Sequence, residues 1–405
     1  MSNKKQLLII CSHFHPMKHI ASYRMNAFAK YLDPSKIEVT VLTISETEKR
    51  KEKVFNNTCA YYLPYNPIFR LRKQKQSMPK WKHWLFSLNN KLMRFFSKSD
   101  YPGWQKNALK QALKLDKKKK IDFILSSFSP IDSHLIAFEF KKRTTGVKWI
   151  ADMRDEMSQN QMLGKKERIY YKKVEGYIFP EADFISAVSS PILDGFKYSK
   201  NKKIQYIEIR NGFDHEEKQI KKRNQTFTFV YAGTFYGKRK PDTFFSALKE
   251  LSDSGQLKIP WKLLFIGTPK NFSIPKQFEK KTSFLEPMEN IEAIKVLSQS
   301  DCNLLIHPPS KAKGIFTGKL FDYLSVKQPI LALVDVEDVA ADLINKCNAG
   351  NPVDFYDIKA IKEEITSIFE RWQNNIENQY NEVLISSLHR KKEVLKLQKI
   401  ILNEI

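Results

Sequence analysis

The segment FTFVYAGTFYGKRKPDTFFSALKELSDSGQLKIPWKLLFIG, residues 227–267, decides the fold. It opens with an apolar run at 227–233, rich in aromatic and β-branched residues, which predicts a buried strand. Residues 242–252 then have helical spacing, and a second apolar run follows at 261–267. A strand, a helix and another strand in this order predict a parallel βαβ unit.

The same alternation runs through most of the chain. After this segment we predict strands at 302–307 and 329–334, with helices at 289–299, 317–326 and 337–346. Before it we predict strands at 7–11, 37–43, 121–127, 147–153 and 182–189, with helices at 22–32, 133–143 and 166–178. The predicted fold class is therefore α/β, with two doubly wound Rossmann-like domains facing a central cleft and a C-terminal helical segment.

The length of 405 residues also favours two domains, because single hydrophobic cores stop growing near about 250–300 residues. A polar, charged stretch, HEEKQIKKRNQ, separates the two alternating halves and predicts a linker. We expect a first domain at 1–212, the linker at 213–225, a second domain at 226–357, and helices at 358–405 that pack back on the first domain.

The chain is strongly basic, with 69 Lys or Arg, 44 Asp or Glu and a net charge of +25. Such an excess favours an anionic partner: a nucleic acid, a membrane surface or a phosphorylated ligand. Residues 68–120 hold 16 of the basic residues against only Asp100 and Asp116, interleaved with Trp and Phe. This composition is typical of a surface that lies at a membrane interface; the alternative is a solvated basic face over an ordinary core.

Cysteine spacing and hydropathy limit the compartment. The four cysteines are far apart and match neither a metal site nor a disulfide framework, which fits a reducing cytoplasm. The apolar run near the N-terminus is too short for a signal peptide, and no run approaches the roughly 18 apolar residues of a spanning helix. We expect a cytoplasmic protein that lies on the inner face of the cell membrane.

The best-defined candidate site is GIFTGKLFDYLSVKQPI, residues 314–330. Thr317 and Gly318 lie where a loop enters a helix, so free backbone N–H groups and the positive end of the helix dipole would meet a phosphate. Lys319 adds a charge, and Asp322 lies one helical turn beyond Gly318, where a carboxylate can accept from two ribose hydroxyls. The simpler alternative is an N-capped helix with a solvated Lys–Asp pair.

A second candidate is YAGTFYGKRKP, residues 231–241. Gly233 and Thr234 end a strand, and Lys238 and Arg239 follow. Ligands of open α/β sheets bind at the carboxyl ends of strands, and clustered cations suit a diphosphate. A basic loop in a basic protein is an equally simple explanation.

A third candidate, WIADMRDEM at 149–157, crowds Asp152, Arg154 and Asp155 at the end of an apolar strand. Charges at such a position are typical of sites, although they also form structural ion pairs. His134, at the start of a helix, is a lone histidine, and by itself this pattern is more typical of a structural residue.

The loop SHFHPMKHIASYR, residues 12–24, contains three histidines and Arg24. The histidine spacing does not fit one helix face, and Pro16 interrupts it, so we expect no metal site here. We predict instead that the loop, with His15, lines the cleft that binds an acceptor.

These segments occur in a familiar order, and over residues 7–350 the chain resembles the retaining GT-B glycosyltransferases of family 4. The similarity is greatest to bacterial enzymes of capsule, O-antigen lipopolysaccharide and exopolysaccharide assembly. Residues 12–32 resemble the opening strand–loop–helix, 149–157 the Asp-x-Arg-Asp segment, and ISAVSSPILDGF with IRNGFD the end of the first domain. YAGTFYGKRKP, FIG and 314–330 resemble the donor-binding domain.

The resemblance implies roles for individual residues. It implies that Asp322 holds the nucleotide ribose, that Arg239 with nearby Lys238 contacts the donor diphosphate, and that Thr317 and Gly318 meet the distal phosphate. The remaining implied donor-binding residues are Gly233, Thr234 and Lys319. His134 and Asp155 would be catalytic, and His15, Arg24 and Arg154 would lie on the acceptor side.

The implied activity is transfer of a sugar from a UDP- or GDP-linked donor to a lipid-linked saccharide in cell-surface polysaccharide synthesis. The resemblance implies retention of configuration, no metal and no further cofactor, since helix dipoles and cations would stabilise the departing diphosphate. The partners would be the donor, the acceptor and an anionic membrane surface contacted through residues 68–120, and no nucleic acid.

The sequence departs from the family pattern at three places. Gly314 stands where the first acid of the paired motif, which approaches the transferred sugar, normally lies. Thr234 replaces an arginine after the strand-end glycine, and residues 15–18 replace a glycine-rich loop. Two other functions stay open: a UDP-sugar 2-epimerase of the same architecture, and a non-enzymatic polyanion-binding protein.

Overall fold

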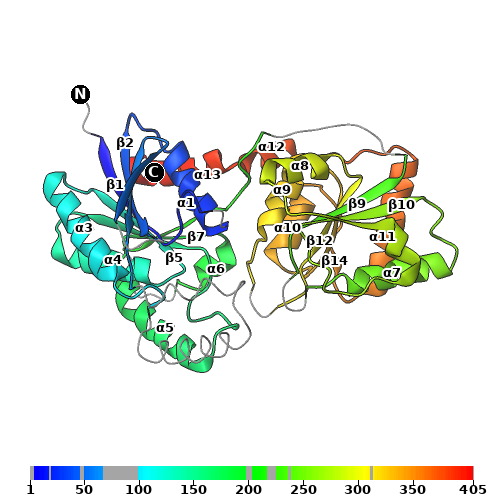
Figure 1. The fold of residues 1–405 in the computed structure, drawn as a ribbon, viewed down its shortest axis with the longest axis horizontal. Helices are drawn as coiled ribbons and strands as arrows, with labels where there is room; N and C mark the ends of the chain where they lie inside the picture. Colours follow the sequence, from blue (N-terminus) through cyan, green and yellow to red (C-terminus); the bar gives the residue numbers. More distant parts are fainter. Residues whose placement is uncertain are drawn as a thin grey trace. The chain divides into compact units, whose positions relative to one another are not determined.

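The computed structural model describes residues 4–17, 20–45, 50–66, 99–197, 203–216, 225–235, 239–310 and 313–404. The chain divides into two compact units (Figure 1). Unit 1 comprises Met1–Arg210 and Val394–Ile405, and unit 2 comprises Asn211–Glu393.

Within the described residues, unit 1 contains an eight-stranded sheet of order β3-β4-β2-β1-β5-β6-β7-β8. The strands are β1 (Lys5–Ile10), β2 (Ile37–Ile44), β3 (Lys51–Phe55), β4 (Thr58–Leu63), β5 (Phe123–Phe128), β6 (Lys148–Met153), β7 (Phe184–Ala187) and β8 (Gln205–Glu208). β3 is antiparallel to β4, whereas the other neighbouring strands are parallel. Parallel neighbours need crossover connections, which the helices supply.

Helices cover both faces of this sheet. On one face α3 (Trp104–Lys118), α4 (Asp132–Arg143) and α5 (Lys165–Ile178) pack against Leu8 and Ile10 of β1. On the other, α1 (Ile20–Tyr31) and the end of α13 (Arg390–Leu402) pack against Leu7 and Ile9 (Figure 1). Because successive side chains of a strand point to opposite faces, both faces need apolar residues, and the β1 sequence is a continuous apolar run.

Unit 2 contains a six-stranded sheet of order β11-β10-β9-β12-β13-β14 in its described part, with parallel pairing throughout. The strands are β9 (Phe227–Ala232), β10 (Trp261–Ile266), β11 (Thr282–Leu285), β12 (Cys302–Ile306), β13 (Ile330–Val334) and β14 (Val353–Asp354). The predicted fold class, two doubly wound α/β sheets with C-terminal helices, is confirmed.

The helices of unit 2 also form two layers. One layer consists of α7 (Asp242–Asp253), η3 (Lys276–Lys281) and α11 (Ile358–Gln373). The other consists of α8 (Asn290–Ser298), α9 (Gly318–Val326), α10 (Val339–Lys346) and α12 (Glu382–Ser387) (Figure 1). The C-terminal segment is thus shared: α11 and α12 pack in unit 2, and α13 packs in unit 1 from Val394 onward.

The structure contains elements that the sequence patterns do not reveal. β3 and β4 form a hairpin whose turn residues, Asn56 and Asn57, have positive φ angles of 46° and 62°. Four of the five residues of β3 are exposed and three of them are charged, so it has no apolar periodicity, as is common for an edge strand. Phe213, at the start of the expected linker, is fully buried in unit 2 instead, and 217–224 lie outside the described residues.

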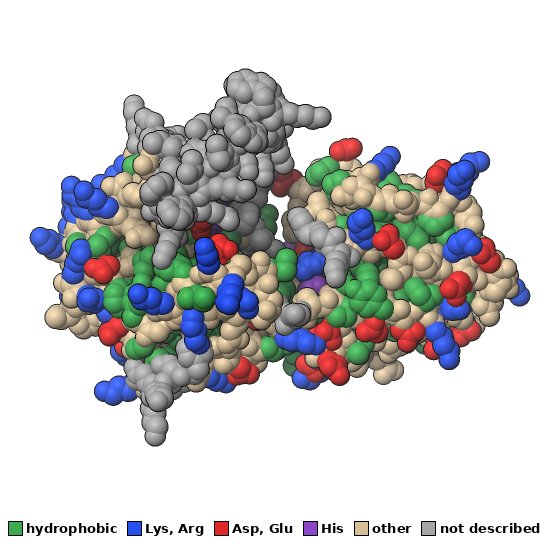
Figure 2. All heavy atoms as spheres, turned by 90° about the horizontal axis from the view of Figure 1, so that it is seen from below, with side chains coloured by type: hydrophobic (Ala, Val, Ile, Leu, Met, Phe, Trp, Pro, Cys, Tyr) green, Lys and Arg blue, Asp and Glu red, His purple; other side chains and the backbone are tan. Residues whose placement is uncertain are grey.

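Most of the basic stretch at 68–120 also lies outside the described residues, which resume at residue 99. In the part that is described, Trp104 is fully buried between α3 and the sheet, so this aromatic residue belongs to the core. Lys and Arg side chains are spread among Asp and Glu over the visible face of each unit (Figure 2). No helix in the described ranges is both long and apolar enough to cross a membrane.

A buried ion pair joins α1 to β6 in unit 1. Arg24 of α1 is 3% exposed, and its Nη2 lies 2.7 Å from Oδ1 of Asp152, which is 0% exposed at the end of β6. Nη1 donates to the carbonyl oxygen of Ile209 at 2.7 Å, and the hydroxyls of Ser127 and Ser186 donate to the Asp152 carboxylate. Burial by itself raises a carboxyl pKa, but Arg24 outweighs it and holds the pKa of Asp152 below its usual value.

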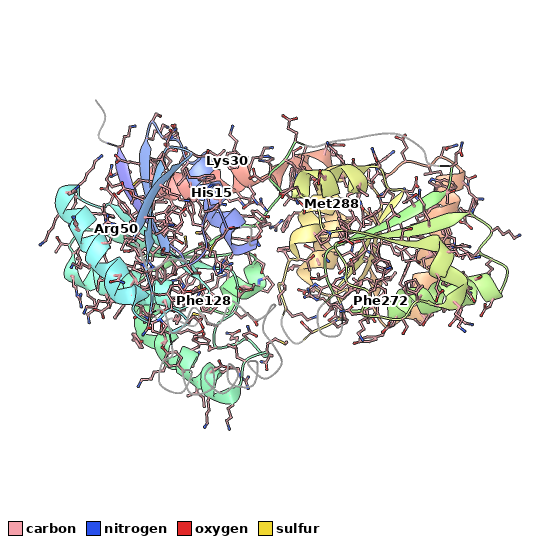
Figure 3. All side chains as sticks on the ribbon, viewed as in Figure 1. His15, Lys30, Arg50, Phe128, Phe272 and Met288 are labelled. Carbon is pink, nitrogen blue, oxygen red and sulfur yellow. The ribbon has the colours of Figure 1, made fainter. Side chains whose placement is uncertain are left out.

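We therefore predict that Arg24→Ala destabilises the protein by about 3–5 kcal/mol, because it leaves an uncompensated carboxylate in the core. The measurement is urea-induced unfolding, with Lys30→Ala as the control. Lys30 is exposed on the same helix (Figure 3) and its loss should change the free energy of unfolding by less than about 0.5 kcal/mol. Equal stabilities of the two variants would contradict a structural role for the buried pair.

Candidate functional site

The carboxyl ends of β9 and β12 bring polar groups of unit 2 together. β9 is followed by Gly233 and Thr234, β12 is followed by His307, and α9 begins at Gly318. All strands of this sheet are parallel, so these ends meet at one edge, where open α/β sheets bind ligands. We call the group formed by Gly233, Thr234, Arg239, His307, Thr317, Gly318, Lys319 and Asp322 the α9 site.

Lys319 lies against the end of β9. Its Nζ donates to the hydroxyl of Tyr231 at 2.7 Å and lies 4.0 Å from the centre of that ring. A Cβ atom added to Gly233, whose φ is +99°, would be 3.4 Å from Nζ, so the backbone and the ammonium group are in near contact. Burial, and secondarily the nearby Arg239, lower the pKa of Lys319 to about 7.

Arg239 is the second cation of the site, and its Nη2 lies 2.9 Å from Nε2 of His307. A guanidinium only donates, so this imidazole nitrogen must be the acceptor and the ring is neutral. Burial, together with Arg239 and Lys319, lowers the pKa of His307 to about 4. Two cations therefore share a partly buried site, an arrangement that an anion would stabilise.

The N-terminus of α9 completes this positive environment. Thr317 is the N-cap residue, yet its hydroxyl makes no capping hydrogen bond. This hydroxyl is buried and has no hydrogen-bond partner within the described part of the chain. The first N–H groups of a helix are also unsatisfied within the helix and point outward. The backbone N–H groups at the start of α9, from Gly318 onward, thus form the kind of helix N-terminus at which anions bind.

Asp322 lies one turn into α9 and is half-buried. Asn290, the first residue of α8, donates to its carboxylate at 3.4 Å. Burial raises the pKa of Asp322 to about 6, against the opposing effect of Arg390. The carboxylate keeps further lone pairs, so it can accept hydrogen bonds from neighbouring hydroxyl groups of a ligand.

The structure brings together most of the predicted residues of unit 2, while Lys238 lies outside the described residues. It also adds His307, Tyr231 and Asn290, which the sequence analysis does not identify as site residues. The only signal for His307 is its position directly after an apolar strand. Nothing local marks Tyr231 or Asn290, since their roles depend on contacts with α9.

Gly314 has a structural reason for not being acidic. Its φ is +84°, in the left-handed region that side-chain-bearing residues rarely adopt. Its N–H donates to Oδ1 of Asp338 at 2.7 Å, which holds the loop before α9. A glutamate at this position would strain the backbone, so the conformation of this loop favours glycine.

The predicted residues of unit 1 separate into two groups. Arg154 and Asp155 follow β6 at the carboxyl edge of the sheet, where Asp155 is exposed. Arg154 donates to the carbonyl oxygens of Phe128, the last residue of β5, and of Ser129, at 2.7 and 2.8 Å. His15 is exposed in the loop after β1, where its ring stacks on Phe55 at 4.3 Å.

The second group is buried. Arg24 is held by Asp152, which favours a structural role over contact with an acceptor. His134 is 0% exposed, with Nδ1 2.7 Å from the Ser126 hydroxyl and Nε2 3.1 Å from Sδ of Met153. Burial lowers the pKa of His134 to about 3, so it is a neutral core histidine at ordinary pH. This environment favours a structural role for His134 too, and its catalytic role stays a prediction.

No group of three or more His, Cys, Asp or Glu side chains among the described residues is placed to hold a metal ion. The α9 site itself offers two cations, a helix N-terminus and a carboxylate. Such a set suits a ligand that carries both an anionic part and hydroxyl groups.

No protein-family model matches the chain, and no curated protein is similar to it in sequence. Solved structures, by contrast, match over nearly the whole length. The lipopolysaccharide outer core galactosyltransferase WaaB is 13% identical, with 99% of this chain and 100% of that chain covered and a TM-score of 0.63. An alpha,alpha-trehalose 6-phosphate synthase from Burkholderia multivorans is 9% identical, with coverages of 99% and 97% and a TM-score of 0.65.

A third match is a trehalose-6-phosphate protein from E. coli whose structure has UDP-2-fluoro glucose bound. It is 12% identical, covers 98% of this chain and 96% of that chain, and has a TM-score of 0.56. At these identities the similarity shows the fold and nothing finer. The chain has the two-sheet α/β architecture of GT-B structures.

The buried histidine generates a prediction about pH. His134 is neutral in the folded state but takes up a proton near pH 6.5 when unfolded, so its contribution to stability is present above pH 6.5 and is lost as pH falls toward 3. We expect His134→Gln to reduce the slope of unfolding free energy between pH 6.5 and 4 by up to about 1.4 kcal/mol per pH unit. Chemical unfolding at several pH values in this range measures the slope, and His15→Gln, at an exposed histidine, is the control. Identical slopes for the parent and His134→Gln would contradict the assignment of His134 as a buried, neutral histidine.

Proposed function

We propose that this chain is a glycosyltransferase that takes a sugar from a nucleotide-sugar donor and transfers it to a saccharide acceptor. The α9 site is the observation that carries the proposal. Its cations, Lys319 and Arg239, adjoin a helix N-terminus whose buried N-cap hydroxyl has no partner among the described residues. Asp322 lies one turn further along the same helix.

The site matches the two halves of a nucleoside diphosphate. A diphosphate would accept hydrogen bonds from the Thr317 hydroxyl and the first N–H groups of α9, and it would offset the repulsion between Lys319 and Arg239. The ribose hydroxyls would donate to Asp322, which Asn290 already orients. The similarity in fold to a galactosyltransferase and to a protein with a UDP-sugar analogue bound supports the same assignment.

The chemistry follows from where charge develops. When the bond between the sugar and the diphosphate breaks, negative charge accumulates on the leaving phosphate oxygens. Donors that are already in place stabilise this charge without reorganising, and this is the largest catalytic effect in many enzymes. Lys319, Arg239 and the α9 N-terminus are such donors, and the acceptor hydroxyl would attack the sugar carbon.

Because Gly314 carries no carboxylate, another group must contact the transferred sugar. His307 is a candidate, since its imidazole is held in the neutral form beside Arg239. We propose that His307 contributes to recognition of the donor sugar. On the acceptor side, the exposed Asp155 is the strongest candidate for a catalytic residue. Arg154 would orient the loops at that edge of unit 1.

The finer assignments rest on the sequence resemblance. We propose a retaining enzyme of family 4 type that needs no metal and acts on a lipid-linked saccharide in cell-surface polysaccharide synthesis. A lipid-linked acceptor would explain the cations and aromatic residues of 68–120, because this composition suits an anionic membrane surface.

The test uses a panel of UDP- and GDP-sugars, with binding measured by thermal shift. A donor that binds the folded state raises the melting temperature. For that donor we expect Thr317→Val to weaken binding about three- to tenfold, because one hydrogen bond is lost. The unliganded variant should be as stable as the parent or more so, since it no longer buries an unsatisfied hydroxyl.

Thr366→Val on α11 is the matched control, because it removes a threonine hydroxyl in the same unit but in the other helix layer. It should leave donor affinity unchanged. Failure of every nucleotide sugar to bind would sink the proposal. If the chain instead interconverts nucleotide sugars when no acceptor is present, the alternative function, a UDP-sugar 2-epimerase, is supported in place of the transferase.

The pKa values of the site predict a bell-shaped pH dependence of donor affinity. Lys319 is protonated below about pH 7 and Asp322 is ionised above about pH 6, so affinity should be greatest between these values. The diphosphate of a nucleotide sugar does not itself titrate there. Calorimetric titrations at several pH values should show that Lys319→Met removes the decline on the alkaline side and that Asp322→Asn removes the decline on the acidic side. Profiles that both variants leave unchanged would contradict these assignments.

A further inference from the structure

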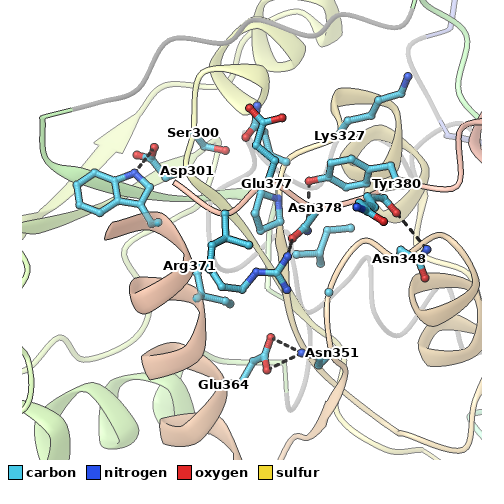
Figure 4. Close-up of a pocket in the computed structure, with 18 of the residues that line it drawn as sticks. Ser300, Asp301, Lys327, Asn348, Asn351, Glu364, Arg371, Glu377, Asn378 and Tyr380 are labelled. Carbon is cyan, nitrogen blue, oxygen red and sulfur yellow. Dashed lines mark hydrogen bonds between the residues drawn. The ribbon is translucent and has the colours of Figure 1, made fainter. Parts of the chain in front are cut away.

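Unit 2 also contains a cavity, at the opposite end of its sheet from the α9 site. A cavity of about 820 Å³ lies at the amino ends of β12, β13 and β14 (Figure 4). Residues just before these strands form one side, and α11 with the loop that follows it, 374–381, forms the other. The volume falls within the range of about 300–1,000 Å³ that is typical of small-molecule sites.

The lining of this cavity is rich in side-chain amides. Seven of its twenty lining residues are Asn or Gln, against 40 in the 405 residues of the chain. Trp372 and Tyr380 also line it. An amide both donates and accepts, as a sugar hydroxyl does, so amides pair well with hydroxyl groups. Flat aromatic rings add dispersion contacts with the C–H faces of a sugar ring.

The charge of the cavity argues against an anionic ligand. Asp301, Glu364 and Glu377 line it, against only two cations, Lys327 and Arg371. Lys327 forms an ion pair with Glu382, and Arg371 donates to Oδ1 of Asn378 at 2.5 Å. A slightly acidic cavity in a chain of net charge +25 is suited to a neutral polar ligand.

Hydrogen bonds within the protein hold the indole of Trp372 and the carboxylates of Asp301 and Glu364 in place before any ligand binds. Asp301 accepts from Nε1 of Trp372 at 2.9 Å and from the N–H of Thr228 at 2.8 Å, which fixes the indole against the start of β9. Asn351 donates to Glu364 at 3.1 Å (Figure 4). A preformed site loses less conformational entropy when it binds a ligand.

Other polar groups of the lining are still available. Asn378, which accepts from Arg371, donates weakly to the Tyr380 hydroxyl at 3.4 Å, so that hydroxyl can donate to a ligand (Figure 4). The side chains of Asn345, in the last turn of α10, and Gln379 have no hydrogen-bond partner among the described residues. The cavity thus combines fixed walls with unused donors and acceptors.

We propose that this cavity binds a neutral oligosaccharide, at a site separate from the α9 site. The combination of amides, aromatic rings and carboxylates with no excess of cations is the observation that carries the proposal. It does not depend on the proposed function, because no residue of the α9 site lines this cavity.

The test titrates the full chain with neutral mono- to tetrasaccharides of glucose, galactose and N-acetylglucosamine, observed by saturation-transfer NMR and calorimetry. At least one tri- or tetrasaccharide should bind more tightly than its monosaccharide. Asn345→Ala and Gln379→Ala should each weaken that binding about three- to tenfold, as expected for one lost hydrogen bond. Both side chains are exposed, so neither variant should change the melting temperature.

Two controls make the outcome specific. Asn374→Ala removes an exposed amide from the same loop that does not line the cavity, and Asp322→Ala alters the α9 site; both should bind the oligosaccharide like the parent. The proposal is overturned if no saccharide binds at millimolar concentration. It is also overturned if Asn345→Ala and Gln379→Ala bind normally, or if Asp322→Ala abolishes binding. None of these results bears on nucleotide-sugar binding at the α9 site.

Discussion

Burial of the parallel sheets on both faces is the constraint on which the rest of this structure depends. Parallel strands require crossover helices, and those helices cover the two faces of each sheet. The strands must then be apolar throughout, as Leu7 to Ile10 are in β1. Because most side chains of the inner strands are committed to the core, groups that a ligand can reach are found mainly at the strand ends. The candidate site of unit 2 accordingly lies at the carboxyl ends of β9 and β12 and at the N-terminus of α9.

The same burial explains why the polar residues inside unit 1 are paired. Arg24, Asp152 and His134 are surrounded by apolar side chains, so each must be satisfied inside the protein. Arg24 and Asp152 satisfy one another, with help from a backbone carbonyl and two serines. His134 stays neutral between a hydroxyl and a thioether. Arg24 and His134, which the sequence suggests as site residues, therefore have partners inside unit 1, and this environment favours structural roles for both.

The α9 site shows the opposite behaviour, since its groups are incompletely satisfied. Lys319 and Arg239 repel one another, and Thr317 keeps a buried hydroxyl that has no partner in the described part of the chain. Folding alone does not favour such an arrangement, and a bound anion would relieve both defects. The amide-rich cavity at the other end of the sheet differs, because its charges are nearly balanced and its indole and carboxylates are held by neighbours. The two ends of one sheet thus differ in the charge of the ligand that they suit.

The sequence by itself determined the inner strands of both sheets, the alternation with helices, the two-domain α/β class and the cluster Thr317, Gly318, Lys319 and Asp322. These features are local, because periodicity and helical spacing act over a few residues. It did not reveal the outer strands β8, β11 and β14, the β3–β4 hairpin, whose edge strand is charged, or Phe213 as a core residue. Only the tertiary structure decided that His307 and Tyr231 belong to the α9 site and that Arg24 and His134 are buried. It also decided that residues just before β12, β13 and β14 form the amide-rich cavity together with α11. Each depends on contacts between distant segments, and local sequence does not encode which distant segments meet.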